Sequence, residues 1–251
     1  MQPWNIAHRG GAGINPENTL PAFADAVASG CDGAELDVQL SRDGMVVVHH
    51  DFRLMAGVAR KGGVWLDAAG PRIKDLTLED LRGYDIGHPQ PDSSYAQKHP
   101  RVRAMDAVVP TLAEVLAVAP PPFRLMVELK CDTSDDSADP LELAQKAYAV
   151  TGDAAIYVGF DWRALSPLVK HGATCWFTTD RLQGDARPVI DAIAQAGGQG
   201  WFPNYPDATP ENVAYARERG LKVGAWTVND PTDMQRLSYL DAICTDRPDL
   251  R

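Results

Sequence analysis

The sequence predicts an α/β protein, a (β/α)₈ TIM barrel with a small insertion after the second strand. Three observations point to this fold. The chain has 251 residues, which matches the roughly 250 residues of such barrels. Short apolar runs alternate with helical patterns, and eight strands can be counted once a hairpin return is set aside. No Gly-x-Gly-x-x-Gly turn follows the first strand, which disfavours the alternative, an open doubly wound sheet.

The first strand and helix define the repeating unit. A strand at residues 4–8 is followed by a loop and by a helix at residues 20–29, which Asn18 or Thr19 can cap with a side-chain oxygen. The second strand follows at residues 33–40. Because a helix connects these two strands, we expect them to run parallel.

A hairpin return follows the second strand. The apolar run at residues 45–50 begins after only four residues, so it can pair only in the antiparallel sense. A two-residue loop, either Arg42-Asp43 or Asp43-Gly44, places His50 on the same face as the acidic residues of the second strand. A three-residue loop would place it on the opposite face. We therefore expect one of the two-residue loops.

Residues 51–109 form a long irregular stretch, which we interpret as an insertion subdomain within one barrel domain that spans residues 1–251. Its one clear element is a short helix at residues 78–82, which Thr77 can cap. In this position the insertion would lie over the C-terminal face of the barrel, form one wall of the site and recognise the part of a substrate beyond the reacting group.

The rest of the chain alternates regularly between helix and strand. In chain order we expect six pairs, each a helix followed by a strand. The helix and strand ranges of the pairs are 112–118 with 124–130, 140–150 with 155–160, 162–170 with 174–178, 187–196 with 200–203, 210–219 with 222–227, and 233–240 with 241–245.

Composition and charge exclude several function classes. The 24 basic and 34 acidic residues leave a net charge of −10, which argues against a nucleic-acid partner. No apolar run approaches the roughly 20 residues that span a bilayer, so we expect no stable membrane insertion. Without a basic and apolar leader at the N-terminus we expect a cytoplasmic protein, unless a leader has been removed. The four cysteines form no C-x-x-C pair and are expected to be buried thiols rather than zinc ligands.

Polar residues gather where the first three barrel strands end. Since active sites of such barrels lie at the carboxyl ends of the strands, and residues two apart in a strand share a face, these side chains should meet. They are His8 and Arg9 on the first strand, Glu35 and Asp37 on the second, and Glu128 and Lys130 on the third, with His50 returning on the hairpin.

The residue types in this group indicate metal-assisted cleavage of a phosphoester. Three neighbouring carboxylates cannot all stay ionised without a cation, and their oxygens favour Mg²⁺ or Ca²⁺. The Arg and Lys side chains suit a phosphoryl oxygen. The two histidines can act as an acid and base pair.

Several residues near this group have two interpretations. Glu17 either orients a side chain at the end of the first strand or favours the N-terminus of the following helix. Phe160 and Trp226 either form an apolar wall for the substrate or pack in the core. His49 should point to the opposite face from His50. We interpret residues 246–248 as a structural turn.

The sequence resembles the glycerophosphodiester phosphodiesterase family. The matching segments follow the family order through the chain and are Ala7-His8-Arg9-Gly10, Pro16-Glu17-Asn18-Thr19, Glu35-Leu36-Asp37-Val38, Ser41-Arg42-Asp43-Gly44, His50-Asp51, Glu128-Leu129-Lys130, Trp226-Thr227-Val228-Asn229 and Thr245-Asp246-Arg247-Pro248. The family commonly has one histidine before the aspartate, whereas this chain has His49-His50-Asp51.

The resemblance implies hydrolysis of a small-molecule glycerophosphodiester to sn-glycerol 3-phosphate and an alcohol. It implies a divalent cation on the three carboxylates, acid and base roles for His8 and His50, and phosphate binding by Arg9 and Lys130. The nucleophile is either water or a neighbouring glycerol hydroxyl. The alternatives are a lysophospholipase D-like or sphingomyelinase D-like activity on lipids and, in another class, a non-catalytic phosphate-binding barrel. The sequence does not predict an oligomeric state.

Overall fold

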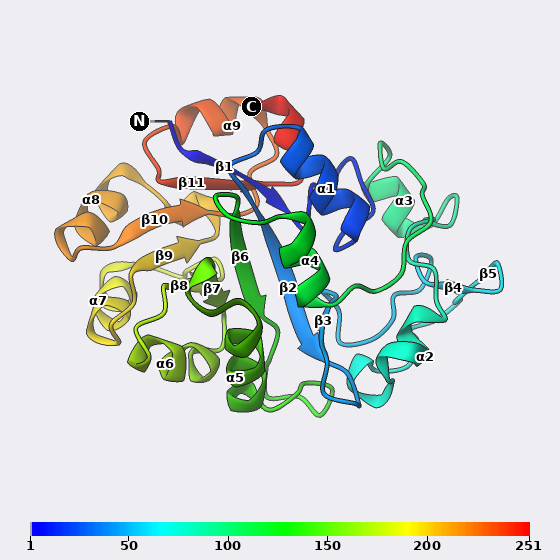
Figure 1. Ribbon diagram of the computed structural model, residues 1–251. Helices are drawn as coiled ribbons and strands as arrows, with labels where there is room; N and C mark the ends of the chain where they lie inside the picture. The colour runs from blue at the N-terminus through cyan, green and yellow to red at the C-terminus, as the bar shows by residue number, and fades with distance from the viewer. Residues whose placement is uncertain (1) are drawn as a thin grey trace.

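In the computed structural model, which describes residues 2–251, eight parallel strands close into a barrel (Figure 1). The first strand pairs with both the last and the second, which completes the ring. The strands are β1 (Trp4–His8), β2 (Gly33–Leu40), β6 (Arg124–Leu129), β7 (Ala155–Gly159), β8 (Cys175–Thr179), β9 (Gly200–Pro203), β10 (Lys222–Ala225) and β11 (Ala242–Thr245). The predicted barrel is confirmed.

Helices form an outer layer around the barrel (Figure 1). They are α1 (Leu20–Ala28), α4 (Leu112–Val118), α5 (Pro140–Thr151), α6 (Trp162–Lys170), α7 (Arg187–Gln195), α8 (Pro210–Glu218) and α9 (Pro231–Arg236), with short 3₁₀ turns η2 (Gly152–Ala154), η3 (Tyr205–Asp207) and η4 (Pro248–Leu250). Thr19, not Asn18, caps α1 and accepts the Ala22 N–H at 3.3 Å. Asp230 caps α9, so this helix begins two residues earlier than expected.

Two apolar layers stabilise the barrel. One cluster, which includes Ile6, Met126 and Trp176, comes from the strands themselves, and a larger one includes the buried sides of the helices. The four cysteines are free and buried, as predicted. Nowhere in residues 2–251 does a helix combine the length and apolar character that crossing a membrane requires.

The hairpin return differs from the prediction. β3 (Val46–Val48) pairs antiparallel with β2, and Val38 lies opposite Val48. The Ser41 N–H donates to the Met45 carbonyl at 3.0 Å, which closes a three-residue loop. Gly44 in this loop has φ +75°, a conformation that glycine adopts without strain. The expected two-residue loop was therefore wrong.

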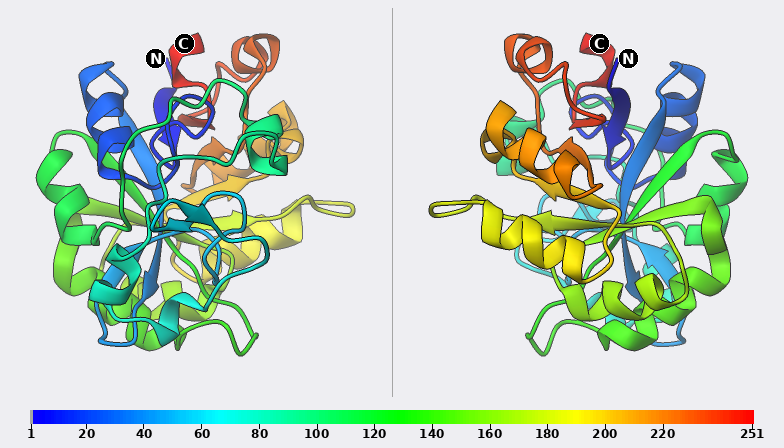
Figure 2. Two further views of the ribbon diagram at one scale, coloured as in Figure 1. Left: turned by 90° about the vertical axis from the view of Figure 1, so that its right-hand side faces the viewer. Right: turned by 90° about the vertical axis from the view of Figure 1, so that its left-hand side faces the viewer.

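The insertion has more regular structure than its sequence suggests. It contains β4 (Arg60–Lys61), β5 (Val64–Trp65), η1 (Ile73–Asp75), α2 (Leu78–Arg82) and α3 (Ser94–Lys98). Only α2, capped by Thr77, was expected. The strands β4 and β5 and the turn η1 are too short to show a periodic pattern. The helix α3 is as long as α2, and its cap, Ser93, is the signal that could have identified it. The insertion has its own apolar cluster around Leu54, Ile73 and Leu81, and it lies in front of the barrel in the left view of Figure 2.

The contact between β2 and β6 should tolerate no side chain at Gly33. A Cβ there would overlap the Arg124 carbonyl oxygen and lie 2.8 Å from the Arg124 Cβ. Because this pair belongs to the barrel ladder, Gly33→Ala should lower the free energy of unfolding by roughly 1–3 kcal/mol. Urea unfolding measures it. Gly159→Ala is the control, since its Cβ would meet nothing closer than 3.6 Å; equal stability of both variants would contradict the prediction.

Candidate active site

A cavity of about 400 Å³ opens at the carboxyl ends of the strands. Strand ends line one side of it, His50 enters from the end of the hairpin return, and Lys98 and His99 of the insertion also line it. Asp37 does not line the cavity; it lies buried in contact with residues that do. The other predicted site residues all line it: His8, Arg9, Glu17, Glu35, His50, Glu128, Lys130, Phe160 and Trp226.

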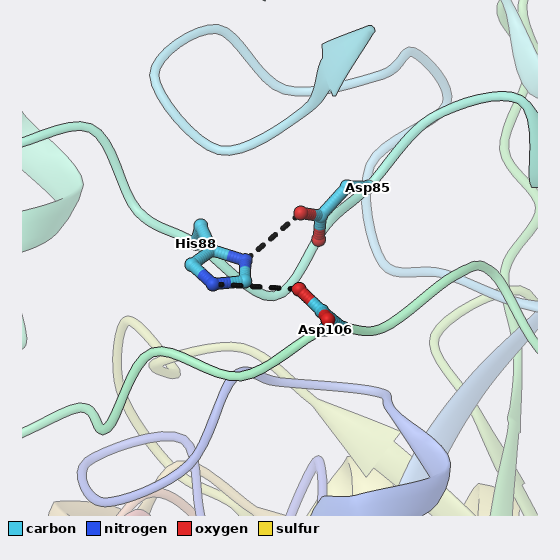
Figure 3. Close-up of side chains that lie close together, drawn as sticks. All are labelled: Asp85, His88 and Asp106. Atoms are coloured by element: carbon cyan, nitrogen blue, oxygen red, sulfur yellow. Dashed lines mark hydrogen bonds and ion pairs between the residues drawn. The ribbon is translucent and has the colours of Figure 1, made fainter. Parts of the chain in front are cut away.

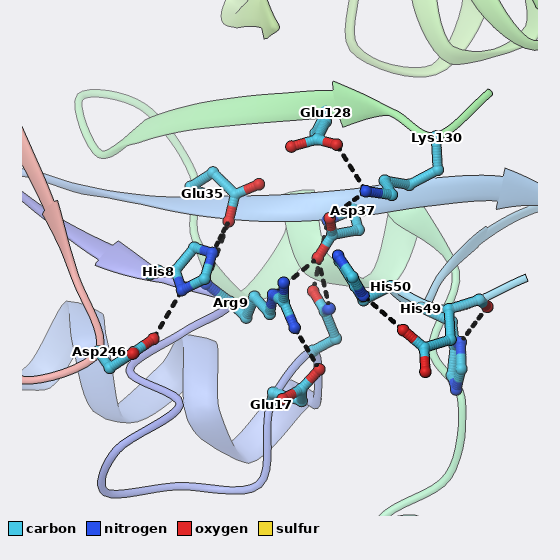
Figure 4. A network of polar contacts seen from close by, with 12 residues as sticks. His8, Arg9, Glu17, Glu35, Asp37, His49, His50, Glu128, Lys130 and Asp246 are labelled. Atoms are coloured by element: carbon cyan, nitrogen blue, oxygen red, sulfur yellow. Dashed lines mark hydrogen bonds and ion pairs between the residues drawn. The ribbon is translucent and has the colours of Figure 1, made fainter. Parts of the chain in front are cut away.

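Three buried carboxylates lie together at one side of the cavity (Figure 4). Glu35 and Asp37 share a face of β2, and Glu128 lies opposite Asp37 in the neighbouring strand β6. One oxygen of each lies within 4.8 Å of the others, and the residues are only 2%, 1% and 9% exposed. Burial, and then the charges of the other two carboxylates, raise the pKa of Glu35 well above its usual value. An all-oxygen, mutually repelling donor set of this kind fits a hard divalent cation.

Two cations balance this cluster. Arg9 donates from Nη1 to Glu17 Oε1 at 2.8 Å, and its Nε lies 3.4 Å from Asp37 Oδ2. Lys130 donates from Nζ to Glu128 Oε1 at 2.7 Å. Burial alone would raise the pKa of Asp37, but the charge of Arg9 and of the other nearby cations lowers it below its usual range. Of the two interpretations of Glu17, the structure therefore supports the one in which Glu17 orients a side chain at the end of β1.

The loop after β1 adopts unusual backbone conformations that direct polar groups into the site. Arg9 and Asn18 have φ +52° and +57°, values that Asn tolerates better than most residues. The Arg9 N–H donates to Glu35 Oε2 at 3.2 Å, and Asn18 donates from Nδ2 to Asp37 Oδ2 at 2.8 Å. Sequence analysis missed this role of Asn18, because its position before a helix suggested a cap instead.

His8 is held by a carboxylate that we had interpreted as part of a structural turn. Its Nδ1 lies 2.6 Å from Asp246 Oδ1, and the second oxygen of Asp246 accepts from Asn229 at 2.7 Å. Burial alone would raise the pKa of Asp246, but the hydrogen bond and charge of His8 lower it to about 2. The chain does turn at residues 246–248, but the side chain of Asp246 also contacts His8, which the turn interpretation did not include. The residue directly follows β11, so the strand-end criterion that identified the other candidates would have found it too.

His50 reaches the cavity although the hairpin register is not the expected one. The strand ends at Val48 and the backbone turns there. The side-chain amide of Gln39 donates to the carbonyls of His49 at 2.7 Å and Asp51 at 2.8 Å, which fixes the turn. His50 Nδ1 lies 2.6 Å from Asp51 Oδ1, whereas His49 is buried outside the cavity lining. The alternation of side chains between the two faces of an ideal strand could not predict the direction of His50, because the backbone bends after the last residue of β3.

Two aromatic side chains form an apolar wall of the cavity. Phe160 and Trp226 pack edge to face, with ring centroids 5.4 Å apart. Trp226 donates from its indole N–H to the Phe202 carbonyl at 3.1 Å, which fixes the ring. Phe160 is 36% exposed. Both residues therefore line the cavity, and Phe160 is not a core residue.

A second group of acidic residues and a histidine lies in the insertion (Figure 3). His88 Nδ1 lies 2.8 Å from Asp85 Oδ2, and its Nε2 lies 3.6 Å from Asp106. Arg60 already pairs with Asp85, and Asp106 is 98% exposed. This group joins β4 to the loop that follows α2 and has the character of a structural ion-pair network.

The model of the glycerophosphoryl diester phosphodiesterase family matches residues 8–250. The chain belongs to this family. A glycerophosphodiester phosphodiesterase of Bacillus altitudinis is 37% identical over 258 residues, which cover 97% of this chain and 94% of the relative. One from Caldanaerobacter subterraneus is 30% identical and covers 99% and 96%. The resemblance noted in the sequence is confirmed, and the chain is an enzyme of this class.

Solved structures of phosphodiesterases share the fold of this chain. A Silicibacter pomeroyi protein assigned to the glycerophosphoryl diester phosphodiesterases superposes with a TM-score of 0.89 at 31% identity, covering 98% of this chain and 90% of that one. An Oleispira antarctica phosphodiesterase, solved in complex with its product sn-glycerol-3-phosphate, gives a TM-score of 0.77 at 25% identity and covers 98% and 94%.

The contact between Asp246 and His8 should be needed for activity. In Asp246→Asn the amide can donate to Nδ1 and favour the wrong imidazole tautomer, so kcat should fall by roughly 10²- to 10⁴-fold. Thermal stability should change little, because the side chain keeps its size. Steady-state kinetics on a phosphodiester measure the effect. Asp249→Asn, which removes only an exposed partner of Arg247, is the control. A near-normal kcat in Asp246→Asn would show that Asp246 does not position His8.

Proposed function

We propose that this chain hydrolyses glycerophosphodiesters to sn-glycerol 3-phosphate and an alcohol, with a bound divalent cation and an acid and base pair of histidines. One observation carries the proposal. Two imidazoles, each with its Nδ1 against a carboxylate, line the same cavity as Glu35 and Glu128, which form a buried cluster with Asp37 behind the cavity lining. The product complex of the Oleispira antarctica neighbour supports the same product class.

Glu35, Asp37 and Glu128 would hold Mg²⁺ or Ca²⁺. The cation would supply Lewis-acid polarisation of the phosphoryl group and offset its negative charge. The fit rests on the chain's own chemistry, because three buried carboxylates whose oxygens lie within 4.8 Å of one another repel each other. Neither histidine nor cysteine belongs to this donor set, which favours a hard ion.

Arg9 and Lys130 would bind the phosphate. Both lie at the rim of the carboxylate cluster, and burial lowers the pKa of Lys130 less than the charges of Glu128 and Asp37 raise it. Lys130 therefore stays cationic. Glu17 holds the guanidinium of Arg9 in place. A diester phosphate carries one negative charge, and two positioned cations would orient it toward the histidines and stabilise the charge that develops during cleavage.

His8 and His50 would move the protons. With Nδ1 of each imidazole held by an aspartate, Nε2 is the atom left for proton transfer. One histidine would remove a proton from the attacking oxygen, and the other would protonate the departing alkoxide as its bond to phosphorus breaks. Attack by water gives the products directly. Attack by the neighbouring glycerol hydroxyl gives a cyclic diester, which water then opens.

Activity should depend on a divalent cation. Release of glycerol 3-phosphate from a panel of glycerophosphodiesters should stop in excess chelator and return with Mg²⁺ or Ca²⁺. Glu35→Gln should weaken cation binding at least roughly tenfold, as measured by calorimetry. In chelator the variant should be no less stable than the parent, because it removes one of three repelling charges. Full turnover in excess chelator, with no metal detected in the protein, would refute the cation.

Replacement of His8 or His50 by Ala should lower kcat by roughly 10²- to 10⁴-fold each. The melting temperature should change little, since both side chains lie at the cavity surface. His171→Ala is the matched control, because His171 is exposed and stacks only on Tyr148. If both site variants kept a near-normal kcat, the acid and base assignment would have to be withdrawn.

A further inference from the structure

A second hollow adjoins the catalytic cavity on the side of the insertion. It has a volume of about 290 Å³ and shares Lys98, His99, Asn229 and Asp246 with the cavity. The hollow therefore lies next to the catalytic cavity, on the side of His8 where Asp246 forms part of both linings. Arg101 and Arg247 complete its charged lining. We refer to the space lined by Lys98, Arg101 and Arg247 as the basic hollow.

The charges of the basic hollow are not balanced within the chain. Arg247 pairs with Asp249, whose charge also interacts with that of Arg101, but in residues 2–251 neither Lys98 nor Arg101 has a carboxylate within ion-pair distance. The one carboxylate in the lining, Asp246, already uses one oxygen on His8 and the other on Asn229. Two cations are thus left without partners beside the active site of a chain whose net charge is −10.

The segment that carries these cations is fixed in place. Tyr95 is buried in the apolar cluster of the insertion, and its ring lies 4.8 Å from the ring of His99. Beyond Arg101, the Arg103 N–H donates to the Ile14 carbonyl at 2.9 Å. The Arg103 side chain donates to Asn15 at 2.8 Å. Residues 98–101 are therefore held against the loop that follows β1.

The floor of the basic hollow also depends on close packing. Gly13 lies there, and a Cβ at this position would come within 2.7 Å of Arg247 Cδ and 2.8 Å of the Asp246 carbonyl oxygen. Glycine lets the loop after β1 approach the end of β11 without a side chain between them. The hollow is thus formed by four converging segments, one from the insertion and three from the barrel loops that follow β1, β10 and β11.

We propose that the basic hollow binds a negatively charged head group, so that this enzyme prefers glycerophosphodiesters whose alcohol carries a second phosphate or a carboxylate over those with a cationic alcohol. The inference rests on the proposed function, because it identifies the substrate class of that same site. Unpaired cations attract an anionic head group and repel a quaternary ammonium. For partly exposed charges each attraction amounts to roughly twofold to fivefold in binding.

The test compares head groups of different charge, two of which have the same carbon skeleton. We would measure kcat/KM for glycerophosphoglycerol and for the same diester phosphorylated on its head group, together with glycerophosphoserine and glycerophosphocholine. The diester with a second phosphate and the diester with a carboxylate are measured separately, so that a comparison of their kcat/KM values identifies the preferred anion. The parent enzyme should favour the anionic diesters over glycerophosphocholine. This preference should shrink between about 0.05 M and 0.5 M salt, because exposed charges are screened.

The variant K98E/R101E should lower the ratio of kcat/KM between phosphorylated and plain glycerophosphoglycerol by about tenfold or more. Lys61→Glu, an exposed lysine elsewhere in the insertion, is the control and should keep the parent ratio. An unchanged ratio in the double variant, or a parent enzyme that favours glycerophosphocholine, would overturn the inference while leaving the proposed function intact. A parent enzyme that cleaves none of the four diesters would refute the proposed function, and the inference with it.

Discussion

Repulsion among three buried carboxylates is the constraint on which the rest of the site depends. Glu35, Asp37 and Glu128 are almost fully shielded from water at the end of β2 and β6. Buried like charges are costly unless cations and hydrogen-bond donors neutralise them. The chain supplies two cations at the rim, Arg9 and Lys130, yet the pKa of Glu35 is still raised by burial and by its two neighbours. The positive charge of Arg9 and Lys130 therefore does not fully balance the three carboxylates, and the cluster fits one further cation from solution.

The barrel meets this constraint through the ends of its strands. Residues two apart on a strand share a face, and neighbouring parallel strands end at the same rim, so a few residues bring several charges together. The strands are fixed by pairing on both sides, and the side chains on them lose little further freedom when they bind a ligand. The turn after β1 adds donors from the backbone, since the left-handed conformation of Arg9 directs its N–H to Glu35. The paired strands fix the positions of the carboxylates, and the turn after β1 supplies a backbone hydrogen bond to one of them.

The same division explains what the sequence could predict. The barrel followed from the alternation of apolar runs, and the cluster followed from spacing along β2 and β6, because both depend on periodic structure. Asp246 also lies at a strand end, and it was missed only because the adjacent Arg and Pro suggested a turn. His50 could not be placed by parity, because its position depends on the amide of Gln39 holding the backbone after β3 has ended. The short elements of the insertion and the left-handed Asn18 depend on contacts distant in sequence, which no local pattern records.

The insertion contributes residues both to the cavity and to the basic hollow. It begins directly after His50 and brings Lys98 and His99 to the lining of the cavity. Its Tyr95 is buried, and after burial the charge of Glu17 is the main cause that raises the pKa of the tyrosine. Glu17 in turn holds the guanidinium of Arg9. A change in how the insertion packs would therefore act on Arg9, the proposed phosphate ligand, as well as on the proposed head-group site. We infer that head-group preference in this chain can be altered freely only at exposed positions such as Lys98, and that substitutions in the core of the insertion would alter turnover and preference together.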